Sequence, residues 1–341
     1  MVTGTTLANT AVPGGRVVSS ATSTGNVLAM ASITYPPIPI FELGPLNLSL
    51  HGLFAGLGFV AGAALMLREV RRRGFDAEAT TSVLTWGLVA AMLGARFFTV
   101  PAHLGDPGYG AKEIFALAGD FSILGGYAGG IIGGIIRFRM LKMPPVPYLD
   151  AAAAGLAIGA VVGRIGDVAI VEHLGSSTDF FLGYLLKPGY EPSPQHSTLQ
   201  DLCDSGTFCG PYHPTGLYDM IGAAVLLGVI FWLARAWKTR RYGQLFAFWI
   251  VWYGLQRFVI DFARLTAARD GLVLPDGTVV DGVIADGMMG TFTGSQWGAL
   301  SAAFLGGVLM VYFGRKNRLV NAENDVWYGA HREAEPVAQE S

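Results

Sequence analysis

The sequence predicts an all-α integral membrane protein with about seven transmembrane helices, an external amino terminus, a cytoplasmic carboxyl terminus and ordered periplasmic loops. Three observations lead to this fold class. Hydrophobic residues make up 52% of the chain and charged residues only 14%, whereas a soluble domain has about 25% charged residues. Apolar segments recur at close to the roughly 20 residues that cross a bilayer. Lysines and arginines gather at alternate ends of these segments, an asymmetry that orients membrane helices.

Seven apolar segments supply the predicted helices. They cover residues 46–67, 81–100, 119–136, 149–172, 216–235, 245–264 and 295–313. Basic residues follow alternate segments in four blocks, at 68–73, 137–142, 235–241 and 315–318, while the opposite loops hold only Lys112, Lys187 and Arg269. Because basic loops stay in the cytoplasm, the basic blocks are assigned to that side of the membrane.

The chain divides into three predicted regions. Residues 1–43 are expected to be a disordered periplasmic extension, 44–316 the membrane domain, and 317–341 a cytoplasmic polar tail. The first 35 or so residues lack the parts of a signal peptide, and Met30 is an alternative start to Met1. A net charge of -2 gives no support for a nucleic-acid partner. No cysteine or histidine spacing suggests a metal site, and no cofactor is predicted.

Two external loops are long enough to have structure of their own. Residues 180–186, within the loop 176–212, look amphipathic, which suggests a segment lying at the membrane interface. In the second loop, Pro-Asp-Gly at 275–277 separates two runs of β-branched residues, which predicts a small hairpin ending near Val280.

Three arginines are predicted to lie at one depth on three helices. Arg96, Arg164 and Arg257 each fall about 12 to 15 residues from the cytoplasmic end of a segment, in the outer half of the membrane, and His51 lies near the outer end of the first segment. A single arginine at this depth is more often a snorkelling or packing residue. Because a guanidinium binds phosphate with two hydrogen bonds, three arginines predict a lipid headgroup site open to the outer leaflet.

Carboxylates accompany two of these arginines. Asp167 follows Arg164 by three residues on the same helical face, and Arg257 shares a face with Asp261 and Arg264. A charge at the centre of a membrane helix costs about 3 kcal/mol, so such groups need a partner, a cavity or a polar ligand. A structural ion pair and an anion site both remain open for the first pair.

Other candidate residues come from less specific patterns. Gly125 and Gly126 begin two rows of glycine at four-residue spacing. Such rows usually indicate close helix packing, and they could also expose backbone groups that a lipid headgroup can approach. His213 and Tyr218 flank the start of the fifth segment, where His213 is either a helix-start residue or a site residue. Asp219, inside the membrane boundary, needs a partner.

These residues carry a resemblance to a known family. Gly163–Asp167 with Glu172 and Gly175 resembles the signature segment of the prolipoprotein diacylglyceryl transferases, which reads Gly-Arg-x-Gly-Asn followed by Gly-Glu and Gly. Four further segments are similar to the family's motifs in order and spacing: Gly94–Arg96, His213–Asp219, Tyr253–Arg264 and Thr293–Gln296. The resemblance covers roughly residues 44–313.

The resemblance implies an enzyme of the bacterial inner membrane. Such an enzyme moves the diacylglyceryl group of phosphatidylglycerol onto the lipobox cysteine of a prolipoprotein signal peptide, forming a thioether and releasing glycerol phosphate. Arginines would hold the phosphate, and a base would help to form the thiolate. The expected catalytic residues are Arg164, Arg257, Glu172 and His51. The expected substrate-binding residues are Arg96, Gly125, Gly126, Asp167, Gly175, His213, Tyr218, Asp261 and Arg264.

Four motif positions differ from the family pattern. Leu124 replaces the histidine of His-Gly-Gly, Asp167 an asparagine, Gly216 a glutamine and His51 a tyrosine. Two functions therefore stay open. In the first, the chain is a transferase in which His51 or Glu172 supplies the base. In the second, it is a noncatalytic or divergent paralogue that binds phospholipid or lipoprotein.

Overall fold

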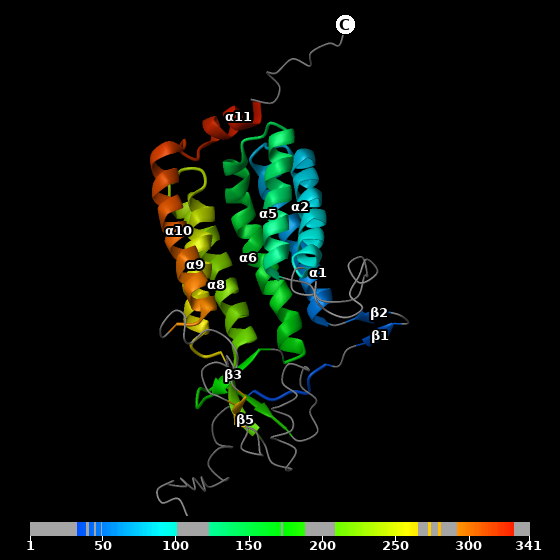
Figure 1. The fold of residues 1–341 in the computed structure, drawn as a ribbon. Helices are drawn as coiled ribbons and strands as arrows, with labels where there is room; N and C mark the ends of the chain where they lie inside the picture. The colour runs from blue at the N-terminus through cyan, green and yellow to red at the C-terminus, as the bar shows by residue number, and fades with distance from the viewer. Residues whose placement is uncertain are drawn as a thin grey trace, which may run out of the picture.

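Seven long helices lie side by side in the part of the chain that the structure describes (Figure 1). This computed structural model describes residues 33–38, 41–43, 46–48, 50–100, 123–171, 173–187, 209–264, 272–273, 279–280 and 292–330. The helices are α1 (Leu50–Arg72), α2 (Ala77–Phe97), α5 (Ile123–Met140), α6 (Pro145–Ala169), α8 (Thr215–Ala236), α9 (Gln244–Ile260) and α10 (Gly294–Lys316). Each overlaps one predicted segment. Four of them, α1, α6, α8 and α10, are long and apolar enough to cross a membrane.

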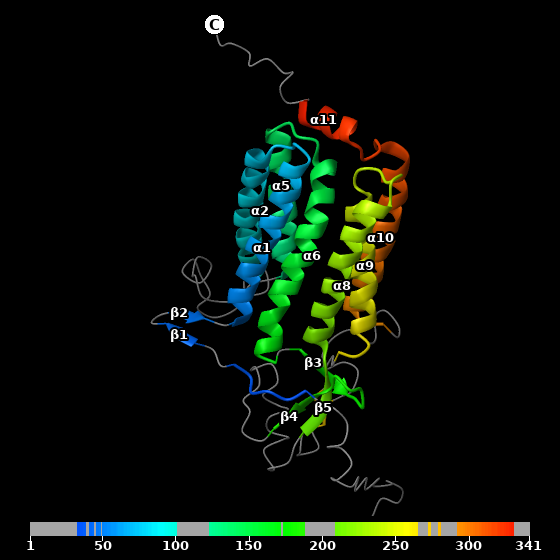
Figure 2. The same ribbon diagram turned by 180° about the vertical axis from the view of Figure 1, so that it is seen from behind.

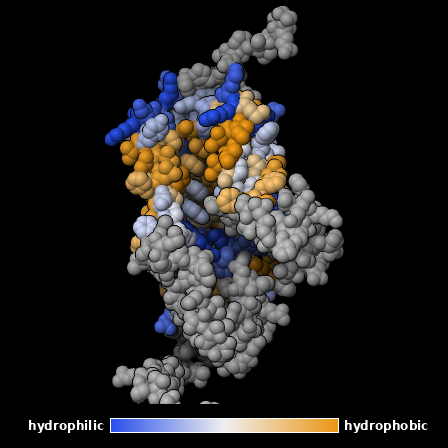
Figure 3. Space-filling model, viewed as in Figure 1, coloured by the Kyte–Doolittle hydropathy of each residue, from blue (hydrophilic) through white to orange (hydrophobic). Residues whose placement is uncertain are grey.

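The helix α6 is the centre of the bundle. It packs against α1 on one side and α8 on the other, while α9 packs against α10 and α2 against α5. Of the four apolar helices, α6 has 44% of its apolar stretch buried, against 11–17% for the others. On the face that Figure 3 shows, an apolar belt covers the bundle, with hydrophilic side chains above it at one end and in a recess below it. The chain is therefore a multi-pass helical membrane protein.

Glycines set the close approach of α2 and α5. A Cβ added at Gly129 would lie 2.2 Å from the carbonyl oxygen of Ala90, and one at Gly94 would lie 2.4 Å from that of Gly125. The glycine row that begins at Gly125 therefore serves helix packing, as small residues do in membranes. The second row is looser, because a Cβ at Gly134 would have no atom within 4 Å.

The two ends of the bundle differ in structure. At one end, here called the sheet end, lie β3 (Leu174–Ser177), β5 (Cys209–Pro214) and β4 (Tyr184–Leu186), paired antiparallel in that order (Figure 2). At the other, here called the arginine end, the helices α1, α5, α8 and α10 finish in basic residues. The short helix α11 (Ala322–Ala330) lies across this end (Figure 1).

Short strands lie in the segments for which loop structure was predicted. The predicted hairpin is confirmed by the antiparallel pair β6 (Leu272–Val273) and β7 (Val279–Val280). A second pair joins β1 (Phe41–Leu43) to β2 (Leu46–Leu48). The interface prediction for 180–186 was wrong for its last three residues, because all three residues of β4 are buried in the sheet. Its aromatic residues Phe180 and Phe181 remain exposed.

Residues 33–38 tie the sheet to α6. The Tyr35 hydroxyl donates a hydrogen bond to the carbonyl oxygen of Val168, and the Ile38 amide donates to that of Ala169 at 3.0 Å. The Tyr184 hydroxyl donates to the carbonyl oxygen of Tyr35 at 2.7 Å. The predicted disorder of residues 1–43 was therefore wrong for residues 33–38, which make these contacts, and for 41–43, which form β1. The other residues of this extension and the last residues of the polar tail, 331–341, lie outside the described residues.

Candidate functional site

Four ionisable side chains from three helices form a continuous chain of contacts at the sheet end. On α6, Arg164 Nη1 donates a hydrogen bond to Asp167 Oδ2, and the other oxygen of this carboxylate accepts a hydrogen bond from His51 Nδ1 of α1. Arg164 Nη2 lies 3.1 Å from Asp219 Oδ2 of α8. We call His51, Asp167, Arg164 and Asp219 the Arg164 network. Asp219 therefore has the partner that it was predicted to need.

A glycine in α6 permits the contact with His51. A Cβ at Gly166 would lie 2.6 Å from the carbonyl oxygen of Leu50 and 2.9 Å from the Cα atom of His51. Only a residue without a side chain lets the start of α1 approach α6 this closely. Asp167 is 1% exposed, so its charge depends on these partners, because an unpaired buried carboxylate is strongly destabilising.

The helix α9 supports the network from a third side. Gln256 Nε2 donates to the Asp219 carbonyl oxygen at 3.2 Å, and it lies 3.4 Å from Asp219 Oδ1. Trp252 Nε1 in turn donates to Gln256 Oε1 at 2.9 Å. The side chain that holds Asp219 is therefore itself held in place.

Arg257 joins α9 to α10. Its Nε and Nη2 atoms both donate to Ser295 Oγ at 3.3 Å. Ser295 lies in the first turn of α10, which Thr293 and Gln296 fix through a reciprocal capping box. Arg257 Nη2 also lies 3.1 Å from Asp261 Oδ1. This contact is ionic only, because both oxygens of the buried Asp261 lack a hydrogen-bond partner among the described residues.

Arg264 and Gly175 connect the end of α9 to the sheet. Arg264 Nη2 donates to His173 Nδ1 at 2.8 Å. A Cβ at Gly175 would lie 2.1 Å from the Ala263 carbonyl oxygen and 3.0 Å from the Cβ atom of His213. Arg264 and Gly175 therefore hold the end of α9 against the start of β3.

His213 and Tyr218 also contact each other. His213 Nδ1 and the Tyr218 hydroxyl are 3.0 Å apart, and their rings stack edge to face at 5.7 Å. Burial lowers the pKa of His213, which favours the neutral imidazole.

The remaining predicted residues lie elsewhere or cannot be placed. Arg96 lies in the last turn of α2, on the α2–α5 pair rather than on the helices that carry the Arg164 network. Gly125 packs against α2, and a Cβ at Gly126 would be 3.6 Å from its nearest neighbour, the Ala95 Cβ. Glu172 lies outside the described residues.

Two supporting residues were missed in the sequence analysis. His173, which accepts from Arg264, follows Glu172 directly and has a φ of 63°, which is unusual for a residue with a side chain. Gln256 precedes Arg257 in its motif. The signal for both was their place inside motifs that had already been singled out.

The fold and this site define a multi-pass helical membrane protein with a polar, arginine-containing site at one end of its bundle. The family model described as prolipoprotein diacylglyceryl transferase matches residues 38–312, and the chain belongs to this family.

Three relatives share the name phosphatidylglycerol--prolipoprotein diacylglyceryl transferase. The protein from Pseudoalteromonas atlantica is 30% identical over 297 residues, 84% of this chain and 93% of the relative. The one from Frankia alni is 26% identical over 251 residues, 72% of this chain and 63% of the relative. The one from Thermus thermophilus is 30% identical over 237 residues, 64% of this chain and 81% of the relative.

Proposed function

We propose that this protein is a phosphatidylglycerol-prolipoprotein diacylglyceryl transferase of the bacterial inner membrane. It would transfer diacylglyceryl from phosphatidylglycerol to the lipobox cysteine of a prolipoprotein. One observation carries this proposal beyond family membership: His51 and Asp167, two of the four departures from the family motifs, are in direct contact. Two of the four substitutions therefore create a histidine–carboxylate pair, which can act as a general base. This favours a catalytically active site over one that has lost its activity.

His51 is the proposed general base. A carboxylate only accepts hydrogen bonds, so Asp167 keeps the His51 proton on Nδ1 and makes Nε2 the basic nitrogen. The His51 side chain is 48% exposed, which suits a group that must meet a substrate thiol. General-base help of this kind is typically worth about 10² to 10⁴ in rate. This arrangement would replace the histidine that the family pattern places at Leu124.

The arginines are proposed to hold the phosphate. The sulfur of the thiolate attacks the diacylglyceryl carbon, the carbon–oxygen bond breaks, and glycerol phosphate leaves with the electron pair, while the thiol proton goes to the base. Asp167 and Asp219 each engage one terminal nitrogen of Arg164. Because a guanidinium has five N–H donors, others can turn to a phosphate. Arg257, fixed by Ser295, would supply the second contact to the developing charge.

The residues around this centre are proposed to bind substrate. The unfilled acceptors of Asp261 suit the hydroxyl groups of a glycerol headgroup. Arg264, His213, Tyr218 and Gly175 lie where α9, α8 and the sheet meet, which is a suitable place for the signal peptide. Arg96, Gly125, Gly126 and Glu172 remain expected contacts from the family resemblance.

Seven membrane spans with an external sheet end complete the proposal. The basic ends of α1, α5, α8 and α10 support a cytoplasmic arginine end. The Arg164 network would then face the side from which a translocated lipobox arrives.

A transfer assay tests the function. The purified protein would be placed in vesicles containing phosphatidylglycerol, with a synthetic lipobox peptide, and the products measured by mass spectrometry. We expect a diacylglyceryl thioether on the cysteine and one glycerol phosphate released per modified peptide. A serine peptide and vesicles of phosphatidylethanolamine serve as controls. Saturable binding of phosphatidylglycerol without any thioether, beside an active relative, would instead support the lipid-binding alternative.

A further inference from the structure

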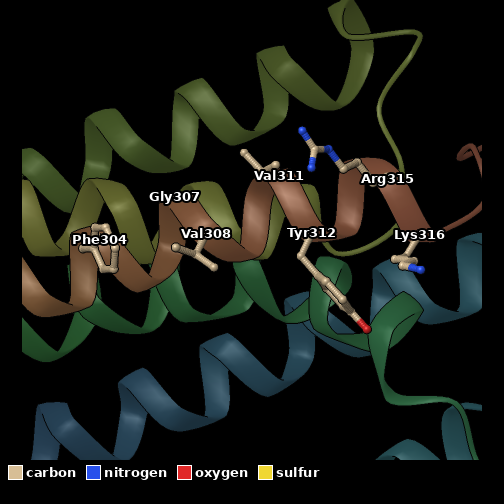
Figure 4. A pocket seen from close by; sticks show the side chains of 7 residues that line it. All are labelled: Phe304, Gly307, Val308, Val311, Tyr312, Arg315 and Lys316. Carbon is tan, nitrogen blue, oxygen red and sulfur yellow. The ribbon is translucent and has the colours of Figure 1, made fainter.

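In the described part of the chain, two of the cavities lie away from the Arg164 network. The larger, about 630 Å³, is an open groove along α10 lined by apolar side chains such as Phe304 and Val308 (Figure 4). It belongs to the apolar belt, where bilayer lipid covers exposed side chains, and it suggests no specific ligand. The second, about 430 Å³, lies at the arginine end between α1, α6, α8 and α9. It includes Asp150, which precedes Arg164 by 14 residues on α6 and is therefore about 21 Å away along the helix.

Arginines dominate the polar wall of this second cavity, here called the arginine-end cavity. Four line it: Arg68, Arg72 and Arg73 from α1 and its end, and Arg235 from α8. Two carboxylates, Glu69 and Asp150, also line it, which leaves a net positive wall. Glu69 already accepts hydrogen bonds from Arg72 and Arg73, at 2.6–2.9 Å. The cavity therefore favours an anion.

Arg73 is the buried anchor of the cavity. It is only 8% exposed, its Nε donates to Glu69, and its guanidinium lies 6.0 Å from the ring centroids of both Phe75 and Tyr242. These contacts fix the planar group, yet Nη1 is buried without a hydrogen-bond partner among the described residues. A buried charged donor left unfilled is costly, so it implies an acceptor that binds there.

Asp150 is the competing explanation. Its Oδ1 accepts from the Leu245 and Phe246 amides at 3.1 and 3.2 Å, while Oδ2 is buried without a partner in the described part of the chain. A small movement that paired Oδ2 with Arg73 would satisfy both groups. It would not explain why Arg68 and Arg235 line the same cavity from two separate helices.

The deeper wall indicates an amphiphile rather than a free ion. Leu65 lies one helical turn inside Arg68, and Phe231 lies one turn inside Arg235. Charged groups at the mouth and apolar side chains one turn deeper match a phosphate headgroup joined to a glycerol backbone and acyl chains. Basic pockets between transmembrane helices on the cytoplasmic side are known to bind such headgroups.

We propose that the arginine-end cavity binds the phosphate headgroup of an anionic phospholipid, as a second lipid site separate from the proposed substrate site. The bound phosphate fills the open donor of Arg73, is flanked by Arg68 and Arg235, and joins α1 to α8. The shared chemistry is an anionic phosphate ester, and the test separates the lipid from a soluble source.

The test compares two double variants of equal charge in the full-length protein. Arg68→Gln/Arg235→Gln removes exposed arginines of the cavity. Arg71→Gln/Arg139→Gln removes exposed arginines of the same end that do not line it. Native mass spectrometry would count the phosphatidylglycerol molecules that remain bound, and titration in mixed micelles would give the affinity. Separate arms would use inorganic phosphate, glycerol phosphate and phosphatidylcholine.

We expect the cavity variant to retain one fewer anionic lipid than wild type, and its affinity for that lipid to fall about 30-fold. Each basic residue near an anionic lipid contributes roughly 1 kcal/mol, and every 1.4 kcal/mol is tenfold. The control variant should change less than about threefold. The lipid should also persist in Arg164→Lys, which impairs the proposed substrate site without the stability loss expected of Arg164→Ala.

Three results would overturn the proposal. Equal lipid counts in both double variants would show that the arginines of the cavity form only a structural ion cluster and bind no lipid. Equal retention of phosphatidylcholine would show that no phosphate charge is recognised. Binding of inorganic phosphate or glycerol phosphate, with no effect of lipid, would assign the cavity to a soluble ligand.

Discussion

Replacing Arg164 with lysine separates the shape of its side chain from its charge. The guanidinium of Arg164 reaches Asp167 with Nη1 and Asp219 with Nη2. An ammonium is a single point charge and cannot hold two carboxylates on different helices while also presenting a fork to phosphate. We therefore expect Arg164→Lys to lose most of the activity that Arg164→Ala loses.

The size of this loss follows from the contacts. A hydrogen bond to a charged group is worth roughly 1.5–3 kcal/mol, so losing one in the transition state lowers kcat/KM about 10- to 150-fold. Alanine goes further, because it leaves Asp167, which is 1% exposed, without its arginine. Breaking a buried pair in this way costs about 3–5 kcal/mol of stability. Arg164→Ala is therefore expected to unfold at a lower temperature, whereas Arg164→Lys is not.

The assay is transfer to a lipobox peptide at matched protein concentration, with thermal unfolding measured on the same samples. Arg139→Ala, an exposed arginine at the opposite end of the bundle, is the control for a general loss of positive charge. Full activity of Arg164→Lys at normal protein levels would show that only the charge of Arg164 matters, and the phosphate-fork reasoning would then be rejected.

Three further predictions concern the fold. A reporter fused to the carboxyl terminus should report the cytoplasm and one inserted in the 188–208 segment the exterior; the reverse result would refute the proposed orientation. Gly129→Ala should destabilise the α2–α5 contact by about 1–3 kcal/mol, because its Cβ would lie 2.2 Å from a carbonyl oxygen, while Gly134→Ala should be neutral in the same unfolding assay. Burial raises the pKa of Tyr35 to about 12, so its neutral phenol contributes stability below pH 10 that is lost as the pH rises toward 12. Tyr35→Phe should cost about 1 kcal/mol at neutral pH and lose less stability than wild type across that alkaline range; parallel pH curves would contradict this.

The sequence predicted the positions of the seven long helices well because each one overlaps an apolar stretch of the chain, and four of them are long and apolar enough to cross a bilayer. The glycine row at Gly125 was also interpretable, since small residues at four-residue spacing form one face of a helix. The same one-dimensional reasoning placed Arg164 beside Asp167 and Arg257 beside Asp261. These are contacts within a helix, and helical periodicity alone defines them.

Contacts between helices could not be predicted in this way. The partner of Asp167 on α1 is 116 residues away in the chain, and nothing in the local pattern of either segment identifies it. Depth in the membrane placed His51 and Arg96 at similar levels, but depth does not say which helices are neighbours. The structure places His51 against α6 and Arg96 on the α2–α5 pair, so only one of them joins the Arg164 network. The strand β4 was missed because its three buried residues also fit an interfacial segment.

The proposed mechanism requires His51 and Asp167 to act as one unit in lipid transfer. The most direct test is kcat/KM for transfer to a lipobox peptide in a cycle of His51→Ala, Asp167→Asn and the double variant. We expect His51→Ala to lower the rate about 10²- to 10⁴-fold. Asp167→Asn should cost about tenfold or more in wild type but less than about threefold once His51 is gone, because its main role is then absent. An unchanged rate in His51→Ala, or the same cost of Asp167→Asn in both backgrounds, would contradict this mechanism.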